Sequence, residues 1–199
     1  LNDPPLERKG NDQTFVSLNE ILKCDIITLH TPLNLSGIDK TVHLINKDNL
    51  AQLKENTILI NTSRGAVIDN TALLETLERK KIITVLDVWE HEPQINTELL
   101  KRADIATPHI AGYSFEGKVN GTIMIYNSLC EFLAIEKRFD FKLPVVQDPI
   151  IKMPFTDRFE VEMDQLISNI YSIAEDDKRM RKMLGMDKTD AVKEFDNQR

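Results

Sequence analysis

Two carboxylates and an imidazole follow short apolar runs in the middle of the chain. Asp87 and His109 each come just after such a run, and Glu92 lies between them. An imidazole has an unperturbed pKa near neutrality, which suits it to accept or donate a proton. A carboxylate hydrogen-bonded to an imidazole fixes its tautomer and favours its protonated form. These residue types indicate proton transfer, with Glu90 as a rival to Glu92 because spacing does not choose between them.

A guanidinium occupies a similar place after another apolar run. Arg64 follows the run 57–61 and precedes Gly65, whose missing side chain permits a tight turn or the close approach of a ligand. Arginine can hold a carboxylate through two parallel hydrogen bonds. The sequence therefore predicts a carboxylate-bearing ligand at this turn, and a solvated surface arginine is the alternative that spacing leaves open.

Alternating strands and helices are expected to position these side chains. We expect strands at 25–29, 57–61, 82–87 and 104–106, and helices that begin at or near Ser17, Asn46, Asp69 and Glu98. Strands that alternate with helices are typical of an α/β fold with a doubly wound parallel sheet. Ligands of such sheets bind outside the carboxyl ends of the strands, so Arg64, Asp87 and His109 are expected at one edge.

The beginning of the chain is interpreted as the end of a further strand. Leu1–Asp3 precedes a proline stop, and an acid at the end of the second strand of a dinucleotide-binding fold bonds the adenosine ribose. None of the seven glycines forms the G-x-G of a phosphate loop. We therefore expect a Rossmann-type NAD-binding domain that is incomplete at its N-terminus.

This interpretation has a consequence for the sheet. In the strand order 3-2-1-4-5-6, the strand at 25–29 would be strand 3, and a gap of two strand places would separate it from the strand at 57–61. We then expect the chain by itself to be prone to aggregation and unable to bind NAD.

The second part of the chain has a helical pattern. Ser114 is a plausible cap for a long helix, the stretch 139–154 is expected to be a linker, and a second amphipathic helix follows. Its apolar stripe consists of Phe159, Met163, Leu166, Ile170 and Ala174. We divide the chain into 1–112, the C-terminal portion of the NAD-binding domain; 113–142, a long helix and linker; and 143–199, the start of a C-terminal dimerisation domain. The tail after Leu143, which carries this stripe, is expected to form a homodimer interface, or else to pack back on its own sheet.

Composition excludes several classes of partner. The formal net charge is −7 with both signs mixed along the chain, so nucleic acid is not expected to bind. The apolar runs are too short for a membrane span. Cys24 and Cys130 are expected to be buried, reduced thiols, which favours the cytoplasm. No pair of histidines has metal-ligand spacing, so no metal site is expected.

Three ordered motifs, NTSRGAVID, LDVWEHEP and PHIAGYSFEGKVNGT, together resemble the D-isomer-specific 2-hydroxyacid dehydrogenases. The resemblance implies that Arg64 binds the substrate carboxylate, that His109 transfers the hydroxyl proton and that Glu92 supports His109. It further implies that Asp87 contacts the nicotinamide carboxamide, that Asp3, Thr31, Thr62, Ser63 and Gly112 line the NAD site, and that Tyr113 contacts the substrate.

The same resemblance implies an activity. With the extension after Leu143, it favours NAD-dependent oxidation of a small phosphorylated 2-hydroxy acid by a cytoplasmic homodimer. An acid at Asp3 fits NAD rather than NADP, whose 2′-phosphate it would repel. The alternatives are a phosphoglycerate or glyoxylate/hydroxypyruvate type of the family, and a dinucleotide-sensing protein without turnover. The set of Arg64, Glu92 and His109 argues against sensing, which needs no proton-transfer pair.

Overall fold

The chain forms two compact units. The computed structural model describes residues 1–10, 12–139, 150–152 and 157–198. One unit comprises Leu1–Ile110 together with Ile173–Arg199, and the other comprises Ala111–Ser172. This division differs from the expected one, because the end of the chain joins the first unit instead of a domain that begins at residue 143. Most of the expected linker lies outside the described residues.

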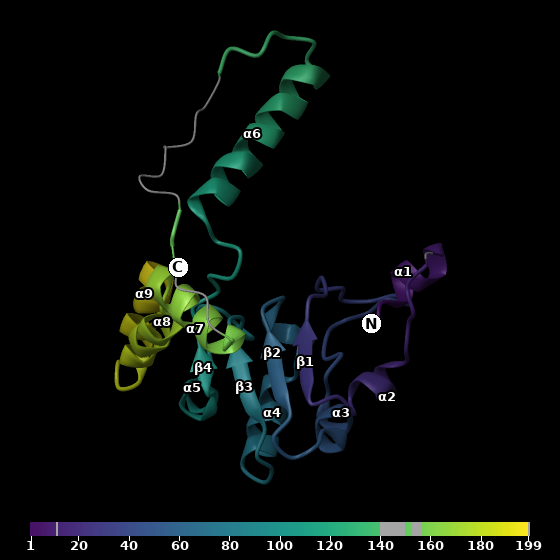
Figure 1. Cartoon of the computed structure of the whole chain (residues 1–199), viewed down its shortest axis with the longest axis vertical. Helices are drawn as coiled ribbons and strands as arrows, with labels where there is room; N and C mark the ends of the chain where they lie inside the picture. Colours follow the sequence, from purple (N-terminus) through teal and green to yellow (C-terminus); the bar gives the residue numbers. More distant parts are fainter. Residues whose placement is uncertain (11, 140–149, 153–156, 199) are drawn as a thin grey trace. The chain divides into compact units, whose positions relative to one another are not determined.

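A parallel sheet is the centre of the first unit (Figure 1). Its strands, in the order β1-β2-β3-β4, are β1 (Ile26–Leu29), β2 (Ile58–Asn61), β3 (Ile83–Leu86) and β4 (Ile105–Ala106). All neighbouring strands pair in parallel. The predicted α/β fold with a parallel sheet is therefore confirmed.

Strand β1 lies directly beside β2. Their register pairs Ile26 with Ile58 and Leu29 with Asn61. The expectation that two strand places separate them is wrong, because a single crossover through α3 (Lys47–Gln52) joins neighbouring parallel strands. The described sheet therefore has no gap between these strands.

The first residues form a helix start rather than the end of a strand. Asp3 caps α1 (Pro4–Lys9), and its Oδ1 accepts a hydrogen bond from the Leu6 amide at 2.9 Å. Proline suits the first turn of a helix, and aspartate is a favoured cap. The expected strand at Leu1–Asp3 is therefore wrong, since the prolines that were interpreted as a stop begin a helix.

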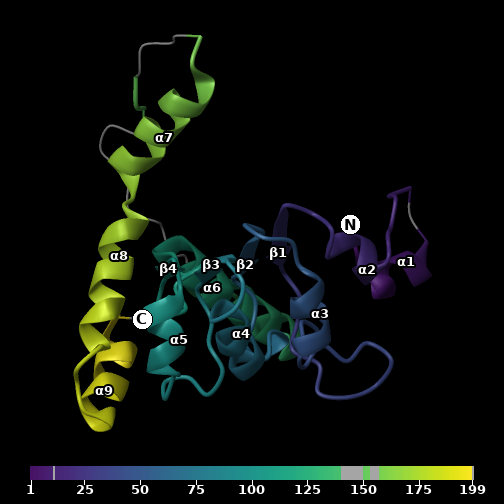
Figure 2. The same cartoon turned by 90° about the horizontal axis from the view of Figure 1, so that it is seen from below.

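Three helices cover one face of the sheet (Figure 2). They are α3, α4 (Asn70–Leu77) and α5 (Thr97–Arg102). Since the strands follow in chain order and parallel crossovers are right-handed, all three helices fall on the same face. The predicted caps Asn46 and Asp69 are confirmed, each accepting from a first-turn amide. The capping box of Ser17 and Glu20 before α2 (Leu18–Ile21) is also confirmed.

Helix α4 ends at Leu77. Beyond this end, Lys80 donates from Nζ to the carbonyls of Ala51 and Leu53 at 2.8 and 2.7 Å. Lys80 therefore binds the end of the neighbouring helix α3.

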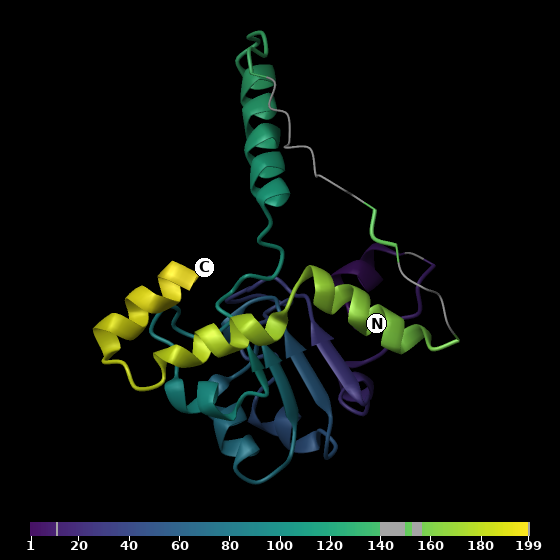
Figure 3. The same cartoon turned by 60° about the vertical axis from the view of Figure 1, so that its left-hand side comes forward.

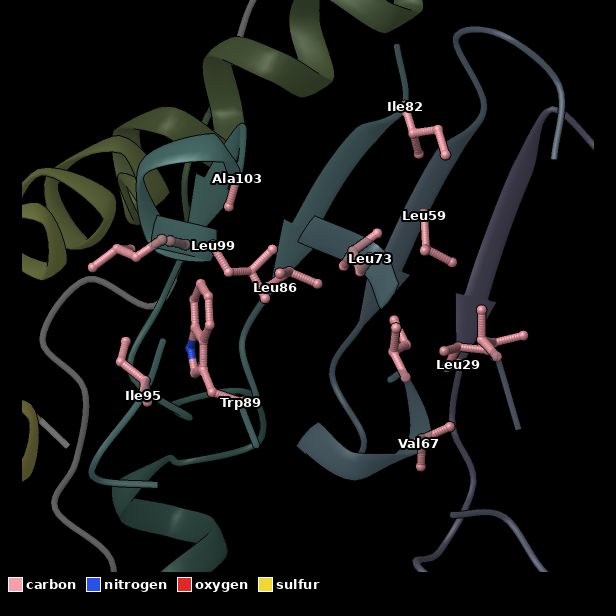
Figure 4. Packing of buried hydrophobic residues seen from close by; sticks show 14 of the residues in the cluster. Leu29, Leu59, Val67, Leu73, Ile82, Leu86, Trp89, Ile95, Leu99 and Ala103 are labelled. Carbon is pink, nitrogen blue, oxygen red and sulfur yellow. The ribbon is translucent and has the colours of Figure 1, made fainter. Parts of the chain in front are cut away.

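The core lies between the sheet and these helices. Leu59, Leu73 and Leu99 are fully buried, from β2, α4 and α5 respectively. Figure 4 shows the Trp89 ring beside Leu86 and Ile95, and its Nε1 donates to the Thr107 carbonyl at 3.0 Å. This packing anchors the loop after β3, which carries the acidic candidates.

The end of the chain packs on β4 and α5 (Figure 3). It consists of α8 (Ile173–Met180), the 3₁₀ turn Arg181–Met183 and α9 (Lys188–Gln198). Asp177 Oδ1 accepts from the Ala106 amide at 2.8 Å, and Arg181 donates to the Ala103 carbonyl at 2.7 Å. Met180 and Phe195 are fully buried. This part of the tail therefore covers its own sheet, which was the alternative to an interface.

The second unit contains α6 (Phe115–Phe132) and α7 (Phe159–Ile170). The predicted cap Ser114 is confirmed, since its Oγ accepts from the Gly117 amide at 2.9 Å. The second predicted helix is interrupted after Ile170, so Ala174 belongs to α8 instead. Among the described residues, no helix has the length and apolar character to cross a membrane.

Both cysteines are free thiols, but they differ in exposure. Cys130 is buried as expected, whereas Cys24 is exposed. The prediction for Cys24 is wrong because the short helix α2 ends at Ile21 and leaves the residue in a surface turn.

Candidate active site at the strand ends

The turn after β2 presents Arg64. Asn61 is fully buried, and its Oδ1 accepts from the amide and the hydroxyl of Ser63 at 3.1 and 2.8 Å. The Asn61 amide group donates to the Arg64 carbonyl at 3.0 Å. The Arg64 side chain is exposed and donates from Nη1 to the Ser63 carbonyl at 2.6 Å. A fixed turn with an exposed guanidinium is suited to bind a carboxylate. The sequence interpretation missed Asn61, whose signal is a polar residue at the end of a buried strand.

Gly65 joins this turn to the loop after β3. A Cβ at Gly65 would lie 1.9 Å from the carbonyl carbon and oxygen of Trp89, and 2.5 Å from the Glu90 amide nitrogen. These distances are far below van der Waals contact, and the neighbouring atoms are backbone. Only glycine therefore allows the two loops to touch.

Asp87 organises the turn after β4. Its side chain is buried, and Oδ1 accepts from the Thr107 hydroxyl at 2.6 Å and from the Ile110 amide at 2.8 Å. Its carbonyl accepts from the His109 amide at 2.6 Å. The acid at the end of β3 therefore fixes the backbone on both sides of His109.

His109 and Glu92 are hydrogen-bonded. Glu92 Oε2 lies 2.7 Å from His109 Nδ1, and the two side chains are 14% and 22% exposed. Glu92 Oε1 accepts from the Trp89 amide at 2.8 Å, so both carboxylate oxygens are engaged. The carboxylate favours the tautomer with a proton on Nδ1, which leaves Nε2 as the proton acceptor. The structure thus brings Glu92, and not Glu90, to His109.

Glu90 lies against a different histidine. Glu90 Oε1 is 2.7 Å from His43 Nε2, and Asp69 Oδ2 is 3.7 Å from His43 Nδ1. Within the described part of the chain, these three residues could each offer one metal-ligand atom within 4.8 Å of the others. Sequence spacing could not reveal this cluster, because its members come from three separate loops.

The remaining residues expected to line the NAD site in the first unit follow β1 and β2 or cap α1. Thr31 follows β1, and its Oγ1 is buried with no hydrogen-bond partner among the described residues. Thr62 and Ser63 follow β2, whereas Asp3 caps α1. An orphaned buried hydroxyl at the end of a strand fits the polar groups of a dinucleotide bound along this edge.

Gly112 and Tyr113 belong to the second unit. Gly112 has a left-handed backbone conformation, with φ of 76°. Lys118 Nζ lies 3.6 Å from the centre of the Tyr113 ring, a cation–π contact. The local geometry therefore gives Tyr113 a cationic neighbour.

Together, the strand ends combine an anion-binding guanidinium with an imidazole held by a carboxylate. Arg64 follows β2, Glu92 follows β3 and His109 follows β4, and these three strands are neighbours in the sheet. A guanidinium can hold a carboxylate while the imidazole exchanges a proton with a hydroxyl. The arrangement therefore suits a substrate that carries both groups.

The family comparison matches the part of the first unit that precedes α6. Residues 2–111 match the family model described as D-isomer specific 2-hydroxyacid dehydrogenase, NAD binding domain.

Two relatives match most of this chain in sequence. The erythronate-4-phosphate dehydrogenase of Proteus mirabilis (strain HI4320) is 45% identical over 192 residues, which are 94% of this chain and 50% of that protein. The protein of the same name from Wigglesworthia glossinidia brevipalpis is 50% identical over 189 residues, or 92% and 49% of the two chains. The chain therefore spans about half the length of these relatives.

Solved structures agree on the fold. A glyoxylate reductase from Paecilomyes thermophila gives a TM-score of 0.54 at 35% identity, covering 65% of this chain and 38% of that one. A D-lactate dehydrogenase from Aquifex aeolicus, complexed with NAD and lactic acid, gives 0.51 at 29% identity, covering 66% and 44%. Both similarities support a Rossmann-type NAD-binding architecture.

Proposed function

Because the chain belongs to the D-isomer specific 2-hydroxyacid dehydrogenase family, whose NAD-binding domain its residues 2–111 match, we propose that the protein carrying it oxidises 4-phospho-D-erythronate. The product is 3-hydroxy-2-oxo-4-phosphobutanoate, an intermediate of pyridoxal 5′-phosphate biosynthesis, and NAD is the acceptor. The observation that carries the proposal is the contact of 2.7 Å between His109 Nδ1 and Glu92. The choice of substrate is supported by the relatives named erythronate-4-phosphate dehydrogenase.

In the proposed mechanism, Arg64 binds the substrate carboxylate and polarises the C2 oxygen. His109 Nε2 accepts the C2 hydroxyl proton, while Nδ1–H remains hydrogen-bonded to Glu92. The O–H and C2–H bonds break as the C2=O bond forms. Bound NAD would supply the acceptor for the hydride that leaves C2, so base and cofactor must flank one carbon.

The other residues bind and orient the reactants. In this proposal, Tyr113 contacts the substrate, and the NAD site is lined by Asp3, Thr31, Thr62, Ser63, Asp87 and Gly112. The orphaned Thr31 hydroxyl and the buried Asp87 carboxylate support this assignment. Asp87 is assigned to the nicotinamide carboxamide.

The test is turnover with several 2-hydroxy acids. It requires a full-length form, in which this chain is joined to a segment that corresponds to the half of the relatives' sequences that it does not span. We expect the highest kcat/KM with 4-phospho-D-erythronate among that acid, D-3-phosphoglycerate and D-glycerate. A preference for D-3-phosphoglycerate or D-glycerate would favour another type of the family. NAD binding without turnover would favour a dinucleotide sensor.

Replacing Glu92 with glutamine in the full-length form is expected to lower kcat by about 10-fold or more. The carboxylate holds the imidazole in the tautomer that leaves Nε2 free to accept the proton, whereas a neutral amide can instead donate to Nδ1. The measurement is steady-state kcat, with Glu75→Gln as the control, since Glu75 pairs with Lys47 at the surface. An unchanged kcat would contradict the assigned pairing.

We also propose that the protein is a homodimer through α7. The apolar stripe of this helix remains accessible, with Phe159 59% and Ile170 65% exposed. Light scattering of the full-length form is expected to give two chains per particle, and one chain after Phe159→Glu with Ile170→Glu. Gln165→Glu, an added charge outside the stripe, is the control and should stay dimeric. A dimer that survives the double substitution would contradict this interface.

A cytoplasmic location completes the proposal. It is supported by Cys24 and Cys130, which are both free thiols. Free thiols persist in a reducing compartment. Fractionation of cells that express the full-length form tests the location.

A further inference from the structure

A second set of polar contacts fastens the loop that carries Glu92. Glu90 Oε1 lies 2.7 Å from His43 Nε2, and Glu90 Oε2 accepts from the Asn70 amide at 2.8 Å. The Glu90 amide donates in return to Asn70 Oδ1 at 3.1 Å. The Glu90 side chain is only 15% exposed. We call His43, Asn70 and Glu90 the Glu90 latch, and the proposed reaction assigns no chemical role to any of them.

The latch joins three separate segments of the chain. The His43 amide donates to the Ala66 carbonyl at 2.8 Å, which ties the segment before α3 to the Arg64 turn. The Asn70 side chain donates to the carbonyls of Ile68 at 3.0 Å and Gly65 at 3.4 Å. Glu90 therefore binds two residues that are themselves hydrogen-bonded to the segment that follows Arg64.

The latch is connected to His109 through short steps. Glu90 is the neighbour of Trp89, whose amide donates to Glu92 Oε1 at 2.8 Å. Glu92 Oε2 then contacts His109 Nδ1 at 2.7 Å. The Trp89 backbone also abuts Gly65, so a displaced Glu90 would release the loop at the point where Glu92 is held.

We propose that the Glu90 latch positions Glu92 against His109, so that His43 and Glu90 are positioning residues for the proton transfer. The inference rests on the proposed function, in which His109 accepts the hydroxyl proton. A carboxylate hydrogen-bonded to an imidazole acts only when it is held in place, and loop displacements of about 1 Å can cost about 10²-fold in rate.

Protein groups engage both carboxylates of the cluster around His43. Asp69 Oδ1 caps α4 by accepting from the Ala72 amide at 2.9 Å, and Glu90 Oε2 is held by Asn70. The oxygens that remain, Asp69 Oδ2 and Glu90 Oε1, face the imidazole itself. The latch therefore needs no metal ion, and dialysis against EDTA is expected to leave turnover unchanged. Loss of turnover that zinc restores would overturn this assignment.

The main experiment compares Glu90→Ala and His43→Ala in the full-length form. Both are expected to lower kcat by about 10-fold or more with little change in KM. Glu90→Gln should restore most of kcat, because its amide can accept from Asn70 and donate to His43. Glu75→Ala, the matched control, should equal the wild type.

A purely structural role gives a different result. The alanine variants would then melt at a lower temperature but keep the wild-type kcat when folded, and this outcome would overturn the proposal.

Failure of the proposed function can be recognised separately. If the wild type does not oxidise any of the acids, the effect of the Glu90 latch on the hydrogen bond between His109 and Glu92 is measured by nitrogen NMR of the His109 imidazole. We expect the Nδ1–H signal of the wild type to weaken in Glu90→Ala. An unchanged signal would overturn the latch whatever the substrate.

Discussion

Replacing His109 with asparagine in the full-length form is expected to lower kcat by about 10²–10⁴-fold, the usual cost of removing a general base. The Kd for NAD is expected to change only a few-fold, since His109 is assigned to the proton and not to the cofactor. Asparagine tolerates the left-handed backbone that His109 adopts, with φ of 58°. The loss therefore reports the imidazole rather than a distorted turn.

The measurements are steady-state turnover and fluorescence titration with NAD. His91→Asn is the matched control, because His91 is exposed and has a similar φ of 62°. It should retain wild-type turnover. An unchanged kcat in His109→Asn would show that another group accepts the proton.

Replacing Gly65 with alanine is expected to impair both folding and turnover. The new Cβ would overlap the Trp89 backbone at 1.9 Å, so the Arg64 turn and the Glu92 loop must separate. Overpacking of this kind lowers the free energy of unfolding by about 1–3 kcal/mol. Displaced loops are expected to lower kcat/KM by about 10²-fold in the molecules that still fold.

Urea unfolding and turnover of the full-length form test this prediction. Gly121→Ala is the control, because Gly121 lies within α6 and its added Cβ meets no atom within 4 Å. That change should leave turnover intact and stability equal or higher, since alanine favours a helix. Wild-type stability and kcat/KM in Gly65→Ala would mean that the two loops need not touch.

Local signals in the sequence predicted most of the elements around the site. Each strand is a short β-branched or apolar run, and Asn46, Asp69 and Ser114 are caps whose side chains bind nearby amides. Such signals depend on residues close in the chain, so the sequence contains them.

The errors arose where two local interpretations compete or where distant residues meet. Asp3 before two prolines fits both the end of a strand and a helix cap, and the cap is observed. The contact between His43 and Glu90 joins residues from separate loops, so no spacing pattern reveals it. Met180 and Phe195 are buried in a tail that packs on α5 and β4, and this contact between distant parts of the chain was not predicted.

In the proposed reaction, hydride leaves C2 of a phosphorylated 2-hydroxy acid while His109 accepts the hydroxyl proton. The most direct measurement follows the isotope when 4-phospho-D-erythronate deuterated at C2 reacts with NAD on the full-length form. We predict that mass spectrometry finds the deuterium in the reduced cofactor, and that His109→Asn makes almost no deuterated cofactor while still binding NAD. Deuterium that stays in the organic acid or passes to water would contradict the claim.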